Sequence, residues 1–404
     1  MHRPALLSDP VSPHGPAAPS WDGYPTPYRL TPSPLRKLLA PSQVPGMISL
    51  ALGAPEPAWF PQAELAEAAQ QVLGAGHGLN YGSSDGLPAL RAWLAEQMRT
   101  RGIAATSEQI LMTNGSQHGL QVALRLLSGR ESAIGLESPT YPGAQQAAEL
   151  TGVPLHALPL ADGRMPDLEH LAWLRREQQV RVLWSMPTAR NPTGVTLDRA
   201  ERELLAGTCA RLGVALVEDD PYHDLWYDAP PAASLAALHP ATIVAGSFSK
   251  VLAPGLRLGW LCVPATLVGP ATVALQATCL GANHLAQQIV WTWLQRGGFP
   301  AHLTRLRNGY RQRRDGLRAA LQAACPQLTI PQDAAGGLFH WVKLPPGVGA
   351  QALSERALAH GVTVIPGGAF HVGGAPDDHL RLAFSLADEV RSVEGARRLG
   401  LALG

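Results

Sequence analysis

Four short polar segments of this chain have residue types that could do chemistry, and each follows an apolar segment typical of a strand. They are residues 113–117 (Thr-Asn-Gly-Ser-Gln), 191–194 (Asn-Pro-Thr-Gly), 218–220 (Glu-Asp-Asp) and 247–250 (Ser-Phe-Ser-Lys). In an open α/β sheet the carboxyl ends of the strands form the ligand crevice. We therefore expect the four segments to meet at one site.

The segment at 247–250 places Lys250 beside groups that suit a phosphate. Two serine hydroxyls and the guanidinium of Arg257, seven residues beyond the lysine, can bind phosphate oxygens. Such a cationic site lowers the pKa of a nearby lysine amine and favours the neutral nucleophile. Only three of the 32 basic residues are lysines, so few candidates exist for this role. The alternative is a solvated loop lysine.

Residues 115–117 (Gly-Ser-Gln) open a predicted helix over 117–127 and could bind an anion there. Glycine permits close backbone approach, and the start of a helix offers free N–H groups. The alternative is that Ser116 only caps the helix.

Asp219 follows the apolar residues 214–217 and is expected to project from the end of a buried strand. A buried carboxylate needs a partner, and the pyridinium nitrogen of pyridoxal phosphate is one such partner. A helix cap or a salt bridge to an arginine is the alternative. Asp220 is a rival, but Asp219 has the better spacing to Tyr222.

Arg381 is a charge inside the otherwise apolar, strand-like segment 379–384. A guanidinium fork in such a position suits a carboxylate ligand. A buried structural ion pair is the alternative.

The bulk composition suits a compact soluble enzyme, with 46% hydrophobic and 16% charged residues in 404. The net charge of +1 gives no reason to expect a nucleic-acid or membrane-surface partner. No stretch approaches the ~20 apolar residues of a membrane helix. The 4 cysteines are scattered without metal-ligand spacing, which favours a reduced, cytoplasmic setting and no metal.

Strand-like and helical patterns alternate along the middle of the chain, which predicts an α/β fold with a mainly parallel sheet covered by helices on both faces. Strands are expected at 109–112, 132–135, 180–184, 214–217 and 242–245. A long helical region over 271–324 precedes a smaller α+β domain with strands at 338–344, 362–365 and 379–384. The predicted boundaries are 1–34 for a flexible Pro-rich N-terminus, 35–75 for an arm that is part of the small domain, 76–300 for the large domain and 301–404 for the C-terminal small domain.

Residues 247–250, followed by 254–259 (Pro-Gly-Leu-Arg-Leu-Gly), resemble the cofactor-lysine segment of the class I/II (fold-type I) pyridoxal-phosphate-dependent aminotransferases. Residues 191–194 and 218–222 resemble two further segments of that family, in the expected order and spacing. The resemblance runs from about residue 34 to the C-terminus. It is strongest to a subgroup of 2-aminoadipate (LysN-type), kynurenine and aromatic aminotransferases, through residues 33–39, 53–56, 81–82 and 336–341.

The resemblance implies a role for each residue around the cofactor. Lys250 would hold pyridoxal phosphate as a Schiff base and then serve as acid and base in the 1,3-proton shift. Asp219 would pair with the pyridine nitrogen, Asn191 and Tyr222 with the phenolic oxygen, and Tyr141 would stack on the ring. The phosphate would be held by Ser116, Gln117, Ser247, Ser249 and Arg257, helped by Tyr81 from a second subunit.

The same resemblance implies a substrate site. Arg381 and Asn191 would bind the α-carboxylate, with Gly53 beside it. Arg36 matches an arginine that contacts a distal acidic group in the aminoadipate enzymes, although a solvated helix residue is an equal alternative. The chain would thus move the amino group of an acidic amino acid, such as 2-aminoadipate or glutamate, or of a broad range of aromatic and aliphatic ones, to a 2-oxo acid such as 2-oxoglutarate. A cytoplasmic homodimer is implied.

Three positions depart from the family pattern: Arg190 stands where glutamine usually precedes Asn-Pro-Thr-Gly, His118 where a second glutamine is common, and Asn114 where threonine is common. Arg190 is expected to add a charge close to the site and to bear on substrate choice. The alternative reactions are those of a C–S lyase or another non-transaminating pyridoxal-phosphate enzyme. A regulator of the same fold is disfavoured, because the Pro-rich N-terminal residues cannot supply a basic DNA-binding domain.

Overall fold

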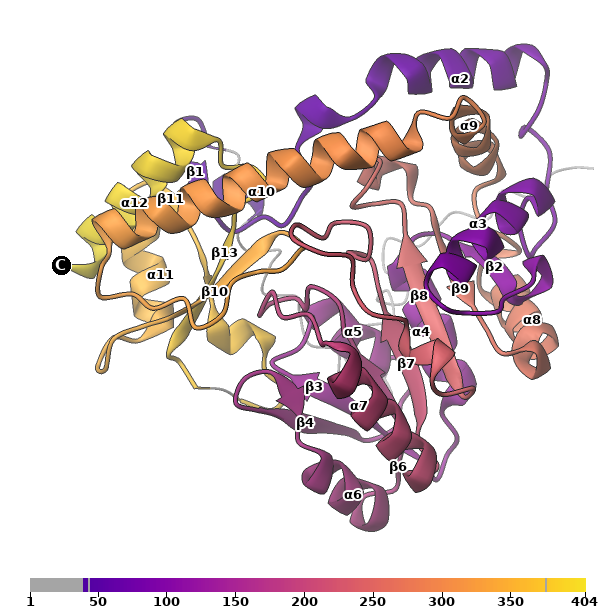
Figure 1. Cartoon of the computed structure of the whole chain (residues 1–404), viewed down its shortest axis with the longest axis horizontal. Helices are drawn as coiled ribbons and strands as arrows, with labels where there is room; N and C mark the ends of the chain where they lie inside the picture. Colours follow the sequence, from indigo (N-terminus) through magenta and orange to yellow (C-terminus); the bar gives the residue numbers. More distant parts are fainter. Residues whose placement is uncertain (1–38, 43, 375) are drawn as a thin grey trace, which may run out of the picture.

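The structure of the chain, a computed structural model, describes residues 39–42, 44–374 and 376–404. Arg36 and the Pro-rich segment 1–34 lie outside the described residues. Within them, an eight-stranded sheet forms the large lobe, and two small sheets belong to a second lobe. Helix α10 (Phe299–Ala324) runs along both lobes in Figure 1.

The large sheet has the strand order β2-β9-β8-β7-β6-β3-β4-β5. Its central strands β8, β7, β6, β3 and β4 run parallel to one another, while β9 is antiparallel to both of its neighbours and β5 is antiparallel to β4. The prediction of a mainly parallel sheet is thus confirmed. The strands are β2 (Ile110–Thr113), β3 (Ala133–Ser138), β4 (Leu155–Ala161), β5 (Met165–Pro166), β6 (Val180–Ser185), β7 (Ala215–Asp219), β8 (Thr242–Ser247) and β9 (Gly259–Cys262).

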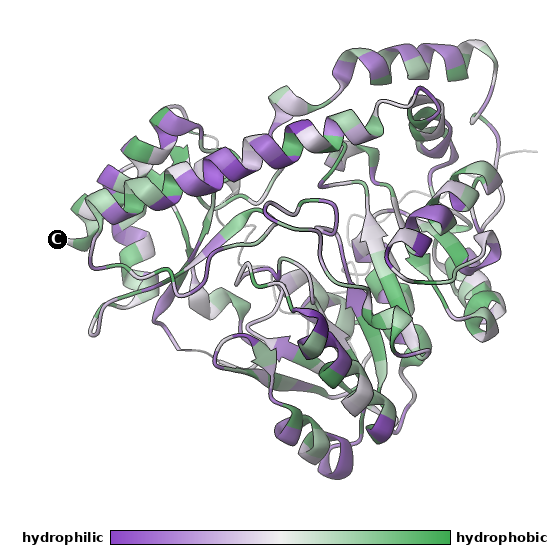
Figure 2. Ribbon diagram, in the orientation of Figure 1, coloured by the Kyte–Doolittle hydropathy of each residue, from purple (hydrophilic) through white to green (hydrophobic). Residues whose placement is uncertain are grey.

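Helices cover the large sheet, as expected for strands that are apolar along their whole length. Helix α4 packs on β7, β8 and β9 and contacts α5 and α8, whereas α7 packs on β7 and contacts α6, which lies against β4 and β6. Figure 2 shows the apolar residues concentrated on the strands and on the helix faces turned toward them. The helices around this lobe are α2 (Gln62–Gly74), α3 (Pro88–Thr100), α4 (Ser116–Leu127), α5 (Pro142–Glu149), α6 (Leu168–Glu177), α7 (Arg199–Leu212), α8 (Val268–Cys279) and α9 (His284–Leu294).

The strand directions bring the four polar segments to one edge. Strands β2 and β8 are both antiparallel to β9 and therefore point the same way. Strands β6 and β7 are parallel to β8. The carboxyl ends of β2, β6, β7 and β8 consequently lie along the same edge of the sheet, where an α/β fold forms its ligand crevice.

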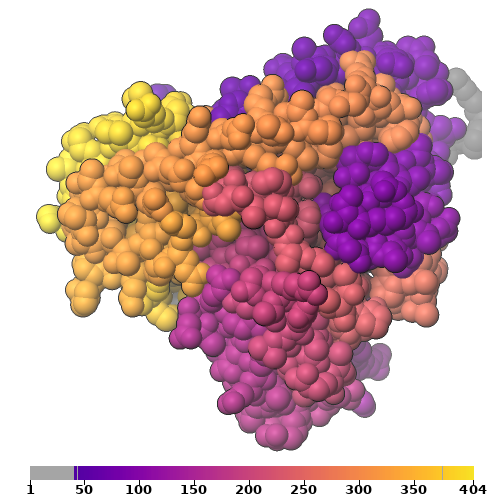
Figure 3. Space-filling model, viewed as in Figure 1, coloured from indigo at the N-terminus to yellow at the C-terminus, as the bar shows by residue number. Residues whose placement is uncertain are grey.

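The second lobe combines both ends of the described chain. Strand β1 (Ile48–Ser49) pairs in parallel with β11 (Val362–Thr363), so this segment near the start of the described residues belongs to the C-terminal lobe. Strand β13 (His379–Ala383) lies between β10 (Phe339–Lys343) and β12 (Ile365–Pro366), antiparallel to both. The lobe also holds α1 (Leu39–Ser42), α11 (Ala350–Ala359) and α12 (Glu389–Leu403). Figure 3 shows this orange-to-yellow lobe lying against the magenta part of the large lobe. The predicted domain boundaries remain predictions.

Candidate active site

A cavity of about 160 Å³ lies at the carboxyl edge of the large sheet, facing the small lobe. It brings together residues that are far apart in the sequence, and most of the predicted site residues line it. The lining residues are Gly53, Ser116, Tyr141, Met186, Asn191, Asp219, Pro221, Tyr222, Ser247, Ser249, Lys250, Phe339 and Arg381.

Lys250 follows β8 and points into this cavity. Its Nζ donates a hydrogen bond of 2.9 Å to the carbonyl oxygen of Gly53 and lies 5.8 Å from the centre of the Tyr222 ring. Burial and the charges of Arg381 and Arg257 lower the pKa of the amine to about 8, although Asp219 opposes the shift. Half of the amines are therefore neutral near pH 8, and a neutral amine is the form that attacks a carbonyl carbon.

Asp219 ends β7, and its buried Oδ1 has no hydrogen-bond partner among the described residues. Burial and the neighbouring Asp220 raise the pKa of its carboxyl to about 8. A buried oxygen without a partner is costly unless a ligand supplies one. A ligand that donates a hydrogen bond to this oxygen would therefore fit the site.

Asp220, the rival candidate, is already engaged. Its Oδ2 lies 2.9 Å from Nδ1 of His223 and 3.4 Å from a guanidinium nitrogen of Arg101. Although burial opposes it, these two partners lower the pKa of the carboxyl to about 2. Of the two aspartates, only Asp219 lines the cavity.

The N-terminus of α4 forms a cradle suited to an anion. Gly115, with φ of 80°, immediately precedes the helix, and a Cβ atom there would lie 2.7 Å from a guanidinium nitrogen of Arg257. A Cβ atom at Gly259 would lie 2.7 Å from the backbone nitrogen of Ser116. These glycines let β9, Arg257 and the free N–H groups of α4 approach one another, as phosphate binding requires.

Three predicted phosphate ligands do not line the cavity of their own chain. Nε2 of Gln117 donates a hydrogen bond of 2.6 Å to the carbonyl oxygen of Gly143, and this side chain does not line the cavity. Tyr81 is 88% exposed and lies outside the cavity of its own chain. Arg257 is also outside the lining, but its charge is near enough to affect the pKa of Lys250.

Arg381 is 2% exposed and makes no ion pair with any carboxylate of the described residues. One terminal nitrogen donates a bond of 2.9 Å to Oδ1 of Asn191, and the other donates a bond of 2.6 Å to the carbonyl oxygen of Ala51. Its guanidinium carbon lies 4.2 Å from the ring centre of Phe339. Burial lowers the pKa of the guanidinium to about 10. A buried cation without an anion fits a site for a substrate carboxylate.

Two phenols border the cavity and stay neutral. Tyr141 precedes α5, and a Cβ atom at Gly143 would lie 2.5 Å from its ring, so glycine is needed there. Burial raises the pKa of Tyr141 and of Tyr222. Neutral phenols can donate a hydrogen bond to a ligand, and a tyrosine ring can also cover a flat cofactor.

The sequence reasoning missed three lining side chains, those of Met186, Pro221 and Phe339, and one backbone group. Met186 directly follows β6, and its sulfur accepts a hydrogen bond of 3.1 Å from the backbone nitrogen of Asn191. Phe339 stacks on Arg381, and the carbonyl of Ala51 holds that arginine in place. The position of Met186 just beyond a strand could have indicated it. The role of the Ala51 carbonyl could not be predicted, because every residue has a backbone carbonyl.

Arg190 does not add an unbalanced charge to the site. It is fully buried, and its nitrogens donate bonds of 2.9 and 3.3 Å to the two carboxylate oxygens of Glu137. A further bond of 2.7 Å reaches the carbonyl oxygen of Arg164. This charge is therefore matched within the large lobe, and the expected effect of Arg190 on substrate choice stays a prediction.

Residues 46–398 match the family described as aminotransferase class I and II. The chain belongs to the class I and II aminotransferases. Among curated members of the family, it is 35% identical to the 2-aminoadipate transaminase of Thermus thermophilus, over 93% of this chain and 94% of that protein. It is 34% identical to the aromatic-amino-acid aminotransferase 1 of Thermococcus litoralis, over 91% of this chain and 90% of that protein.

Solved aminotransferases share the fold. The crystal structure of LysN, an α-aminoadipate aminotransferase of Thermus thermophilus complexed with N-(5'-phosphopyridoxyl)-L-leucine, matches with a TM-score of 0.85 and 33% identity, covering 93% of this chain and 95% of that one. The kynurenine aminotransferase of Pyrococcus horikoshii matches with a TM-score of 0.86 and 31% identity, covering 93% and 95%. The fold-type I assignment is therefore confirmed.

Pyridoxal phosphate is the cofactor of this aminotransferase, and the cavity fits it on two counts. The buried Oδ1 of Asp219 lacks a partner, as a residue facing a protonated ring nitrogen would. The α4 cradle beside Arg257 presents donors to a phosphate. Lys250 supplies the amine between them.

Among the described residues, no single helix combines the length and the apolar character needed to cross a membrane. Helices α8 and α9 satisfy length and composition only as a pair bent by 119°.

Proposed function

We propose that this aminotransferase takes its amino group from an acidic amino acid, such as 2-aminoadipate or glutamate, or from a broad set of aromatic and aliphatic ones. The acceptor is a 2-oxo acid such as 2-oxoglutarate. The observation that carries the proposal is the buried Arg381, which no carboxylate of the described residues neutralises, in the same cavity as the amine of Lys250. A substrate carboxylate at Arg381 would present its Cα toward Lys250.

The residues of the chain divide the work. Arg381 and Asn191 bind and orient the α-carboxylate, which fixes the Cα–H bond of the substrate relative to Nζ of Lys250. The neutral amine of Lys250 would take the proton from Cα of the substrate and return it at the cofactor carbon on the other side of the amino nitrogen. Oδ1 of Asp219 would accept a hydrogen bond from the protonated ring nitrogen of the cofactor. Phe339 forms an apolar wall of the cavity, and such a wall keeps water from the reacting atoms.

Bound pyridoxal phosphate supplies the electron sink that accepts the charge left when the Cα–H bond breaks. The phosphate is proposed to lie at the N-terminus of α4, against Ser116 and Arg257, with Ser247 and Ser249 beside it. Ser249 donates its backbone N–H to Oγ of Ser247 over 3.0 Å, which keeps the two residues in one turn after β8. Tyr141 and Tyr222 are proposed to contact the cofactor ring and its phenolic oxygen.

A half-reaction screen tests the proposed donors. The holoenzyme is mixed with one amino acid at a time, without an oxo acid, and the absorption of the bound cofactor is followed. Glutamate and 2-aminoadipate are expected to convert the cofactor to its amino form, and 2-oxoglutarate is expected to reverse the change. A protein that responds to no amino acid contradicts the proposal, and release of pyruvate and ammonia without an acceptor indicates a lyase instead.

We also propose a homodimer in which Tyr81 reaches the partner's phosphate site. Tyr81, Leu79 and Leu280 are exposed apolar side chains. The segment that carries Tyr81 is tightly seated on α9, since a Cβ atom at Gly78 would lie 2.9 Å from the Cα atom of Leu285. An exposed apolar cluster on a well-packed segment suits a subunit interface. Light scattering should give twice the monomer mass, and Tyr81→Ala should weaken cofactor retention; a monomeric holoenzyme with full cofactor content overturns this proposal.

A cytoplasmic location is proposed on the state of the thiols. Cys209, Cys262, Cys279 and Cys325 are free, and a reducing compartment keeps thiols in that state. Fractionation of the source cells tests the location.

A further inference from the structure

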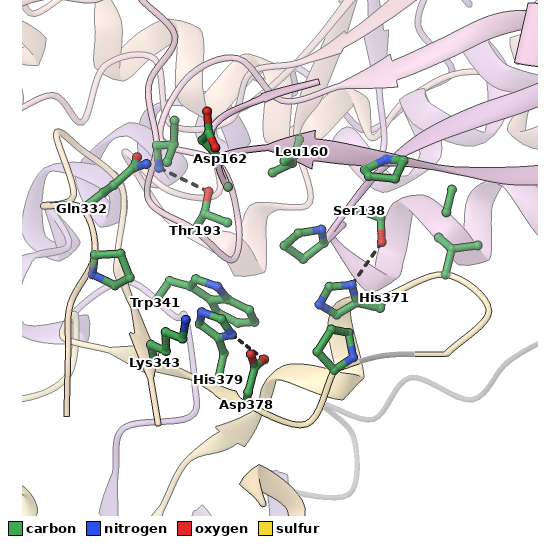
Figure 4. A pocket seen from close by; sticks show the side chains of 18 of the residues that line it. Ser138, Leu160, Asp162, Thr193, Gln332, Trp341, Lys343, His371, Asp378 and His379 are labelled. Atoms are coloured by element: carbon green, nitrogen blue, oxygen red, sulfur yellow. Dashed lines mark hydrogen bonds and ion pairs between the residues drawn. The ribbon is translucent and has the colours of Figure 1, made fainter. Parts of the chain in front are cut away.

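A second and larger cavity, of about 590 Å³, lies between the large sheet and the small lobe. One wall comes from β3, β4 and the loop after β6, and the facing wall comes from β10, β13 and the residues that follow the short helix η8 (Gly367–Phe370). Figure 4 shows side chains of both walls pointing into the space between them. Closely packed interiors leave few voids larger than a water molecule, whereas small-molecule sites span about 300–1,000 Å³. This cavity therefore has the size of a ligand site.

The cavity shares its construction with the candidate active site. In the loop after β6, Asn191 lines the active site and Thr193 lines the second cavity. After β3, Tyr141 lines the first and Ser138 the second. The two cavities thus lie back to back, and the same short segments form a wall of each.

The small sheet repeats this arrangement. Trp341 on β10 pairs in register with Arg381 on β13, and Lys343 pairs with His379. Alternate residues of a strand lie on one face, so these two pairs follow each other along the same face of the sheet. Arg381 lines the active site, while Trp341, Lys343 and His379 line the second cavity. The proposed carboxylate site at Arg381 and the second cavity are therefore separated by only two residues along each strand.

Phe370 connects the two spaces. Its ring centre lies 4.9 Å from the guanidinium carbon of Arg381 and 5.7 Å from the ring centre of Trp341. Its carbonyl oxygen accepts a hydrogen bond of 2.5 Å from the backbone nitrogen of Thr140 in the large lobe. The next residue, His371, lies 3.2 Å from Oγ of Ser138 through Nδ1. A ligand that moved the His371 segment would therefore move the ring that covers Arg381.

The lining indicates what kind of ligand fits. Lys343 is exposed at the edge of the cavity and has no hydrogen-bond or ion-pair partner for its amine among the described residues, whereas His379 is matched by Asp378 at 2.7 Å. Much of the remaining surface is apolar, including Trp341 and Leu160. Asp162 is exposed on the opposite wall, as Figure 4 shows, and disfavours a second negative group. One unmatched cation with apolar surroundings suits a single carboxylate on an apolar body.

We propose that this cavity binds a small monocarboxylic acid with an apolar body, and that the bound acid changes the affinity of Arg381 and Asn191 for the substrate carboxylate. The site is additional to amino-group transfer, which needs only the first cavity. The acid lies with its carboxylate at Lys343 and its apolar body against Trp341. Its effect reaches Arg381 through His371 and Phe370.

Calorimetry on the holoenzyme with 3-phenylpropionate tests the binding, because this acid has neither an amino nor an oxo group to react. The wild type is expected to bind two molecules per chain, one at Arg381 and one at Lys343. Lys343→Gln should weaken one of the two sites about tenfold, as expected for loss of a charged hydrogen bond, and leave the other unchanged. Ala157→Phe, which fills the cavity from β4, should remove the same site, while Arg181→Gln, an exposed charge outside the cavity, should change neither. A single site per chain, or equal isotherms for the wild type and Lys343→Gln, overturns the proposal.

Inhibition kinetics test the coupling. In the amino-acid half-reaction of the wild type, 3-phenylpropionate should raise the apparent Kd of the amino acid with a curved dependence on acid concentration, because the acid acts at two sites. In Lys343→Gln the dependence should become linear, with kcat/KM unchanged when the acid is absent. A linear dependence in the wild type rules out the coupling. Calorimetry needs no turnover, so an inactive holoenzyme that binds two molecules contradicts the proposed function and leaves the second site standing.

Discussion

Two buried arginines differ in what neutralises them: Arg190 lies in the loop after β6, and Arg381 on β13 contacts that loop at Asn191. Arg190 is fully buried against both carboxylate oxygens of Glu137, which also accept bonds from Oγ of Ser185 and the backbone nitrogen of Met186. Arg381 is also buried, but among the described residues it donates hydrogen bonds only to an amide oxygen and a carbonyl. The charge of Arg190 is balanced by a carboxylate of the protein, whereas the charge of Arg381 is free to bind the carboxylate of a ligand. Burial alone does not mark a functional arginine; burial without a carboxylate does.

Asp219 at the end of β7 and Asp220 directly after it show the same contrast for negative charges. Asp220 has a histidine and an arginine as partners, and its pKa is lowered to about 2. Asp219 has an oxygen without a partner, and burial raises its pKa to about 8. Adjacent residues in one motif thus divide into a structural and a functional carboxylate.

Replacing Arg381 should cause the largest loss of activity. Arg381→Leu is expected to lower kcat/KM for the amino acid about a thousandfold, since removing one partner of a buried charge pair costs about 4 kcal/mol. The urea midpoint should stay the same or rise, because a buried cation without an anion is removed. Steady-state kinetics and urea unfolding give the two values. A marked fall in stability would place Arg381 in the same structural class as Arg190.

Replacing Arg190 should show the reverse pattern. Arg190→Gln leaves Glu137 buried without its cation and is expected to cost about 3 kcal/mol of unfolding free energy. The double variant Arg190→Gln/Glu137→Gln should recover most of that loss. KM for the amino acid should change little in the variants that fold. If the double variant is no more stable than the single one, the two charges are not coupled as described.

The two aspartates can be separated in the same way. Asp219→Asn should lower kcat about a hundredfold, because the carboxylate that accepts the hydrogen bond of the ring nitrogen is lost, which is within the range of one acid–base contribution. Asp220→Asn should mainly lower stability, as Arg101 and His223 lose their partner. Kinetics and thermal unfolding of both variants provide the measurement. Equal effects of the two substitutions on kcat would contradict the assignment of Asp219 as the functional carboxylate and Asp220 as the structural one.

The lowered pKa of Lys250 predicts a modest pH dependence. Below the value of about 8, the neutral fraction of the amine rises about tenfold for each pH unit. The rate at which the apoenzyme captures pyridoxal phosphate should follow this fraction and level off above pH 8. Stopped-flow absorbance measures it. A rate that continues to rise to pH 10 indicates an amine with the ordinary lysine pKa.

Much of the fold could be predicted because the central strands are apolar along their whole length. The expected strands at 180–184 and 242–245 end within two residues of β6 and β8. Strand β4 was missed, since its half-exposed residues include His156 and Pro159. The single helical region expected over 271–324 divides into α8, α9 and α10 at Leu280 and Gly297, which adopt positive φ.

The small lobe shows where local pattern fails. Residues 362–365 were expected to form one strand, but they contribute to β11 and β12, which belong to different sheets. At the site, residue type and position after a strand were enough to indicate Lys250, Asp219 and Arg381. The direction of Gln117 and the partner of Arg190 depend on long-range contacts, with Gly143 and Glu137, that no local pattern contains.

Borohydride reduction of the holoenzyme, followed by peptide mass spectrometry, tests the assignment of the cofactor amine most directly. Reduction fixes the cofactor to whichever amine holds it, and the chain offers only Lys37, Lys250 and Lys343 as lysines. The phosphopyridoxyl group is expected on the peptide that contains Lys250, and Lys250→Ala should carry none. A label on Lys343, or an unlabelled wild-type protein, would contradict the site described.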